Sequence, residues 1–137
     1  MSINQVFYVS RASSNITIAD VRNILSISQR NNRRLDLTGC LLYSGRHFAQ
    51  VLEGREEVII STISSVTTDG RNRDIRILLN RQIPLRQYPT WSMAGLYNLD
   101  LDDRLEHLLN DRGPVPPSDE LFDLMEGIRV DTVMGDL

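Results

Sequence analysis

The spacing of apolar residues changes period in a fixed order along the chain, and this order constrains the fold more than any other feature. Residues 5–10 alternate β-branched or aromatic side chains on two faces, which predicts a strand with Tyr8 on one face. A helical period then continues to about Asn31, behind the capping pair Thr17 and Asp20. The sequence therefore begins with a strand and a helix.

The next segment predicts a β-hairpin followed by a second helix. Two runs with a period of two, residues 37–43 and 47–53, flank the turn signal at 44–46. Gly54 ends the hairpin, and residues 56–66 carry helical spacing with acidic residues in the first turn, as the helix dipole favours.

Two more strands complete the pattern, at 75–79 and around 91–97. The order strand, helix, strand, strand, helix, strand predicts a ferredoxin-like α+β fold, a five-stranded mixed sheet with two helices on one face. Two later amphipathic stretches, separated by a glycine- and proline-rich segment at 113–117, predict two C-terminal helices over the other face. We expect one domain, with its core in 1–97 and a two-helix extension in 98–137.

Composition excludes several classes of protein. The net charge of -3 argues against sequence-independent binding of nucleic acid, which needs a basic surface. The exposed-looking cluster Arg30, Arg33 and Arg34 most simply complements the dipole at a helix end. The single cysteine, Cys40, cannot form an internal disulfide, and no apolar run approaches the roughly 18 to 20 residues that span a bilayer. We expect a cytoplasmic protein that does not bind membranes.

Polar residues interrupt the apolar stripe of the first helix. The stripe that includes Ile24 continues at Ser28, Asn31 and Asn32, where further aliphatic residues would be expected. Buried amides need hydrogen-bond partners, and a ligand can supply them. The alternative is that the two asparagines simply end the helix and bond to its backbone.

A second interruption lies in the third strand. Gln50 lies between Phe48 and Leu52 on the face assigned to the helices. Because its amide both donates and accepts, Gln50 could bridge the hydroxyl of Tyr8 to a heterocyclic ligand. Taken separately, however, Gln50 could be satisfied by the backbone, and Tyr8 could be an ordinary core tyrosine.

Other chemistries have weaker support in the sequence. His47 and His107 have no cysteine or carboxylate at ligand spacing, so we expect no metal site, and we expect His47 to be exposed. Cys40 lies mid-strand, as a buried residue would, and no catalytic triad or phosphate-binding loop is evident. The pair Asp102 and Asp103 most simply opens a helix.

Four segments together resemble one family. They are VFYVS at 6–10, SQRNN at 28–32, LTGCLLYSGRHFAQVLEG at 37–54 and WSM at 91–93. In these segments the chain resembles BLUF domains, the blue-light sensors that use FAD, and most closely their short single-domain members. The resemblance covers roughly residues 2–97.

The resemblance implies a non-covalent flavin site, with FAD as the expected cofactor and FMN as the alternative. Tyr8 matches the photochemical tyrosine of the family, and Gln50 matches the glutamine that switches between that tyrosine and the flavin. Asn32 matches the amide that holds a flavin carbonyl. Ser28 and Asn31 match polar residues of the same pocket.

Further positions follow from the same resemblance. Ile24 and Val66 match the aliphatic residues on either side of the flavin ring, and Trp91 and Met93 match the fifth-strand pair that relays the change. Ser65 stands where many members carry a basic residue facing the flavin, so one cofactor contact differs here.

The function expected from these residues is photosensing without enzymatic turnover. We expect no output domain, so the signal would pass to an unidentified partner protein. The apolar residues Leu121, Met125 and Ile128 could cover the sheet or self-associate, and we expect a homo-oligomer. One alternative is a light-inert ferredoxin-like module that binds another small molecule. A flavin enzyme is a second alternative, but the chain shows no substrate site or nucleotide-binding fingerprint.

Overall fold

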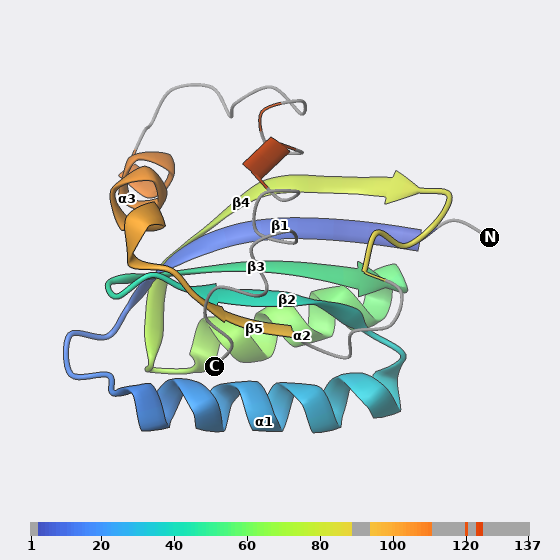
Figure 1. The fold of residues 1–137 in the computed structure, drawn as a ribbon. Coiled ribbons are helices and arrows are strands. Elements are labelled where there is room, and N and C mark those ends of the chain that lie inside the picture. The colour runs from blue at the N-terminus through green and yellow to red at the C-terminus, as the bar shows by residue number, and fades with distance from the viewer. Residues whose placement is uncertain (1–2, 89–93, 111–119, 121–122, 125–137) are drawn as a thin grey trace.

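The computed structural model describes residues 3–88, 94–110, 120 and 123–124, and a five-stranded sheet forms its centre (Figure 1). The elements, in chain order, are β1 (Ile3–Ala12), α1 (Ile18–Leu35), β2 (Thr38–Tyr43), β3 (His47–Gly54), α2 (Glu56–Thr68), β4 (Asn72–Ile83), β5 (Ala94–Tyr97), the short 3₁₀ helix η1 (Leu99–Leu101) and α3 (Asp102–Asn110). The predicted order of strands and helices is confirmed.

The sheet has the strand order β4-β1-β3-β2-β5. β1 pairs antiparallel with β3 and β4, and β2 pairs antiparallel with β3, while β5 lies parallel to β2. The sheet is therefore mixed, as a ferredoxin-like core with one added strand requires. In Figure 1, α1 and α2 lie against one face and α3 lies on the other.

The helices and edge strands differ from prediction mainly at their ends. The predicted capping pair is present, because Asp20 donates its backbone N–H to Thr17 Oγ1 at 3.1 Å and accepts one in return at 3.0 Å. α1 continues past Asn31 to Leu35, where Asp36 adopts a left-handed conformation with φ of 55°. β4 is longer than the predicted 75–79, because its polar, exposed positions on the sheet edge hide the period of two.

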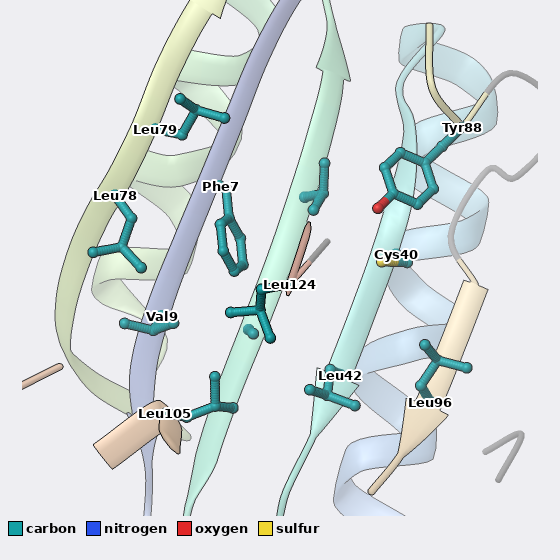
Figure 2. Close-up of a cluster of buried hydrophobic side chains, with 12 residues drawn as sticks. Phe7, Val9, Cys40, Leu42, Leu78, Leu79, Tyr88, Leu96, Leu105 and Leu124 are labelled. Atoms are coloured by element: carbon teal, nitrogen blue, oxygen red, sulfur yellow. The ribbon is translucent and has the colours of Figure 1, made fainter. Parts of the chain in front are cut away.

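Side chains alternate to the two faces of the sheet and form two apolar clusters, as the period of β1 and β3 predicts. One cluster lies beneath α1 and α2 and includes Tyr8 and Phe48. The other lies on the opposite face, shown in Figure 2, and includes Phe7 of β1, Cys40 of β2 and Leu105 of α3.

The prediction that His47 is exposed was wrong. Its side chain is 0% exposed, and Nδ1 lies 2.9 Å from Oδ1 of Asp102 while Nε2 contacts the Glu106 carboxylate. Arg11 of β1 bonds to the same Glu106 at 3.0 Å. This polar cluster joins the start of β3 to α3, so Asp102 both opens α3, as predicted, and attaches it to the hairpin.

The second predicted C-terminal helix falls mainly outside the described residues. Within it, Glu120, Asp123 and Leu124 are helical, and Leu124 is buried in the cluster beneath α3 (Figure 2). Leu121, Met125 and Ile128 lie outside the described residues.

None of the helices in the described part of the chain is long and apolar enough to cross a membrane.

Candidate functional site

The register of β1 and β3 places Tyr8 and Gln50 directly opposite each other on the face covered by α1 and α2. The Tyr8 hydroxyl donates a hydrogen bond to Oε1 of Gln50. Tyr8 is 2% exposed and Gln50 is 5% exposed, so this bond is screened from water. The two residues that interrupt the pattern therefore form one buried polar pair.

A small cavity of about 50 Å³ opens above this pair, between the sheet and the two helices. Its lining includes Tyr8 and Gln50 from the sheet, Ile24 and Ser28 from α1, and Val66 from α2. We call it the inner cavity.

A larger groove of about 390 Å³ adjoins the inner cavity between α1 and α2. The two spaces share four wall residues, Ile24, Ser28, Val66 and Asp69, so they lie side by side. We call this space the outer groove. The walls of the inner cavity include the apolar residues Leu41 and Phe48, whereas the walls that belong to the outer groove alone are mostly polar.

Two buried polar atoms at the inner cavity have no hydrogen-bond partner. They are Oγ of Ser10 and Oδ1 of Asn72, and both residues line the cavity. A buried polar atom without a partner is costly, because it has lost its bonds to water. A ligand with both donor and acceptor groups would satisfy these atoms.

The electrostatics of the site keep the Tyr8 phenol protonated. Burial, and secondarily the negative charge of Asp69, raises the pKa of Tyr8 well above its ordinary value. Asp69 itself keeps its charge, because hydrogen bonds from Arg71 lower the pKa of its carboxyl. The proton of the buried pair therefore resides on Tyr8 at neutral pH.

The structure brings most of the predicted site residues together. Tyr8 and Gln50 line the inner cavity, and Ile24, Ser28 and Val66 line both spaces.

The remaining predicted residues lie along the outer groove or beyond the described chain. Asn32 is buried at the groove. Asn31 and Ser65 line the groove from exposed positions, so Asn31 is not the buried amide that its place in the apolar stripe of the first helix predicted. Trp91 and Met93 lie outside the described residues.

Sequence reasoning missed several residues of the site. Ser10 carried a usable signal, because a strand with a period of two places it on the same face as Tyr8. Asp69 and Asn72 lie in the loop after α2 and at the start of β4, and no periodicity assigns such positions to a cavity. Arg34 faces the groove rather than only ending a helix.

The Cys40 thiol is buried in the apolar core. Burial raises the pKa of the Cys40 thiol to about 12, so this side chain is a protonated member of the core at neutral pH. Within the described part of the chain, no group of three or more histidine, cysteine, aspartate or glutamate residues is arranged to hold a metal ion.

Comparison with known proteins identifies relatives over most of the described chain. The profile of the family described as sensors of blue-light using FAD matches residues 3–94. The blue light- and temperature-regulated antirepressor BluF of Escherichia coli (strain K12) is 31% identical over 102 residues, which are 74% of this chain and 25% of BluF. The photoactivated adenylate cyclase subunit beta of Euglena longa is 28% identical over 95 residues, which are 69% of this chain and 11% of that protein. The chain thus spans a quarter or less of the length of these two relatives.

Solved structures share the fold. The dark-state structure of BlrB, described as a BLUF protein, superposes with a TM-score of 0.78 at 26% identity, covering 95% of this chain and 97% of BlrB. Klebsiella pneumoniae BlrP1 superposes with a TM-score of 0.70 at 30% identity, covering 94% of this chain and 33% of BlrP1. Because the profile matches well over half of the chain, this protein belongs to the BLUF family of blue-light sensors.

Proposed function

We propose that this chain senses blue light through a non-covalently bound flavin, with Tyr8 and Gln50 as the switch. The observation that carries the proposal is their buried hydrogen bond at the wall of a cavity that also holds two unpartnered polar atoms. The two atoms need a ligand that offers both donors and acceptors, and the apolar walls Ile24 and Val66 suit a planar ring. A bound flavin meets both needs, and it would supply blue-light absorption and, once excited, a strong oxidant.

In this proposal Tyr8 gives an electron and then, through Gln50, its phenolic proton to the excited flavin, and later takes both back. Its raised pKa supports this role, because the proton is present on the phenol before illumination. Gln50 already accepts the Tyr8 hydrogen bond through Oε1. Its amide can rotate or tautomerise while Tyr8 is altered, and the exchanged hydrogen bond that persists afterwards is the signal.

We also propose that the output is an interaction with a partner protein and not catalytic turnover. One relative is described as an antirepressor and another as a subunit of a photoactivated cyclase, so their descriptions link related domains to regulation. Here α3 is attached to β3 through His47, three residues before Gln50, which gives a path from the switch to the opposite face. We propose that the protein also forms homo-oligomers. Light scattering that finds only monomers would contradict this.

The test is an absorbance spectrum of the purified protein in darkness and after blue light. The proposal predicts a flavin spectrum in darkness, and a red-shifted flavin spectrum after illumination that returns to the starting spectrum in darkness. A flavin spectrum that does not shift would favour the light-inert module, and flavin reduction in darkness by an added substrate would favour an enzyme. Either result would contradict photosensing.

A further inference from the structure

The outer groove contains a cation that no described carboxylate neutralises. Arg34, in the last turn of α1, lines the groove from an exposed position. None of the ion pairs among the described residues includes Arg34. The other arginine of the groove, Arg71, is paired with Asp69 at 2.8 Å and also donates to Asn23 at 3.2 Å. The net positive charge of the groove is therefore at Arg34.

Helix geometry separates this charge from the inner cavity. Ser28 lines both spaces, and Arg34 follows it by six residues on α1, which is roughly 9 Å along the helix axis. A ligand whose ring occupies the inner cavity would place only a polar extension at this distance.

The opposite wall of the groove carries hydroxyl groups. Ser61, Thr62 and Ser65 of α2 line it. The Thr62 hydroxyl donates to the carbonyl of Val58 at 2.9 Å, and the Ser65 hydroxyl donates to the carbonyl of Ser61 at 3.3 Å. These are local bonds to the helix backbone, and a hydroxyl can rotate from them to donate to a ligand oxygen. Arg34 and these hydroxyls form a set of donors that lines the groove from two helices.

We infer that Arg34 binds the ribityl phosphate of the flavin nucleotide, so that the groove selects phosphorylated flavins over riboflavin. This inference rests on the proposed function. Arg34 offers a planar set of donors that suits a phosphate, and charge-assisted bonds of this kind are stronger than neutral ones. The Asp69 carboxylate, which would repel a phosphate, lies at the junction with the inner cavity and is held by Arg71. The charges thus set the orientation, with the ring inside and the phosphate at Arg34.

The test compares the dissociation constants of riboflavin, FMN and FAD for flavin-free protein in darkness, by quenching of flavin fluorescence. Arg34→Ala should weaken binding of FMN and FAD about tenfold to a hundredfold and change riboflavin binding by less than about twofold. The matched control is Arg33→Ala, which removes an exposed cation from the same turn of α1 but does not line the groove. It should change none of the three constants by more than about twofold.

Three results would overturn the inference on its own. One is wild-type protein that binds FMN no more tightly than riboflavin, and this result would leave the proposed function intact. The second is an Arg34→Ala variant that weakens riboflavin binding as much as FMN binding, which would show damage to the pocket as a whole. The third is an Arg34→Ala variant that weakens neither. Wild-type protein that binds none of the three flavins would refute the proposed function, and the inference with it.

Discussion

Ser10 has a buried hydroxyl that lacks a hydrogen-bond partner at the inner cavity. Ser10→Ala should leave the free energy of unfolding of the flavin-free protein unchanged, or raise it by up to about 1 kcal/mol, because no hydrogen bond is lost. The same change should weaken flavin binding about twofold to tenfold. Chemical denaturation and a flavin titration measure the two effects.

Ser44→Ala is the matched control. The Ser44 hydroxyl is also buried, but it donates to Oδ1 of Asp102 at 2.6 Å, away from the cavity. Its loss should lower the free energy of unfolding by about 2 kcal/mol and leave flavin affinity unchanged. If Ser10→Ala lowered the free energy of unfolding of the flavin-free protein as much as Ser44→Ala does, the Ser10 hydroxyl would have a hydrogen-bond partner within the protein. That result would contradict its assignment to the flavin site.

For single residues, the sequence predicts which side chains share a face of a strand better than it predicts their hydrogen-bond partners. Strand alternation places Tyr8 with Val6 on one face of β1, and Gln50 with Phe48 and Leu52 on one face of β3, and all five side chains belong to the cluster beneath α1 and α2 or line its cavity. The direct pairing of the two residues depends on the register between β1 and β3, which no local pattern determines. His47 was assigned to the solvent because its carboxylate partners lie 55 and 59 residues away in the chain.

At the scale of elements, the contact between α3 and the hairpin should depend on pH through Asp102. Burial raises the pKa of Asp102, but hydrogen bonds from Ser44, His47 and Arg46 outweigh burial and hold it well below its usual range. Because the pKa in the folded state is below the unfolded value of about 4, the charged carboxylate stabilises the fold above about pH 4. This stabilisation is lost as the pH falls through the folded-state pKa.

Asp102→Asn should therefore have a lower free energy of unfolding than the wild type at about pH 7. The difference between the two free energies should shrink as the pH is lowered toward about pH 3. Urea denaturation at the two pH values measures it. The neighbouring Asp103 has a side chain that is 99% exposed, so Asp103→Asn should differ little from the wild type at either pH. Equal pH dependence in Asp102→Asn and the wild type would show that this carboxylate does not hold α3.

Element boundaries were predictable where a local signal marks them and not elsewhere. The capping pair at Thr17 correctly marks the start of α1, whereas its end at Leu35 depends on the left-handed turn at Asp36. β4 runs over Asn72–Ile83 because it pairs with the whole length of β1, and only part of it has an alternating pattern. The wall that α2 contributes to the outer groove depends on how the two helices pack, which sequence spacing does not give.

At the scale of the whole molecule, flavin binding should stabilise the fold. The walls of the inner cavity and outer groove come from the sheet, α1 and α2, and these walls come together only when the chain is folded. A ligand in this space therefore binds the folded state and not the unfolded chain. Free flavin at about a hundred times its dissociation constant should raise the free energy of unfolding by about 2.7 kcal/mol. Thermal denaturation with and without added FMN measures this effect, and an unchanged midpoint at saturating FMN would contradict the assigned site.

The most direct measurement of the switch is the light-minus-dark absorbance difference of flavin-loaded Tyr8→Phe beside that of the wild type. Phenylalanine keeps the ring volume at the cavity but removes the hydroxyl that donates to Gln50. We expect a reversible red shift in the wild type and none in Tyr8→Phe, although both proteins bind flavin. A full red shift in Tyr8→Phe would contradict the proposal that the buried Tyr8–Gln50 pair converts light into a signal.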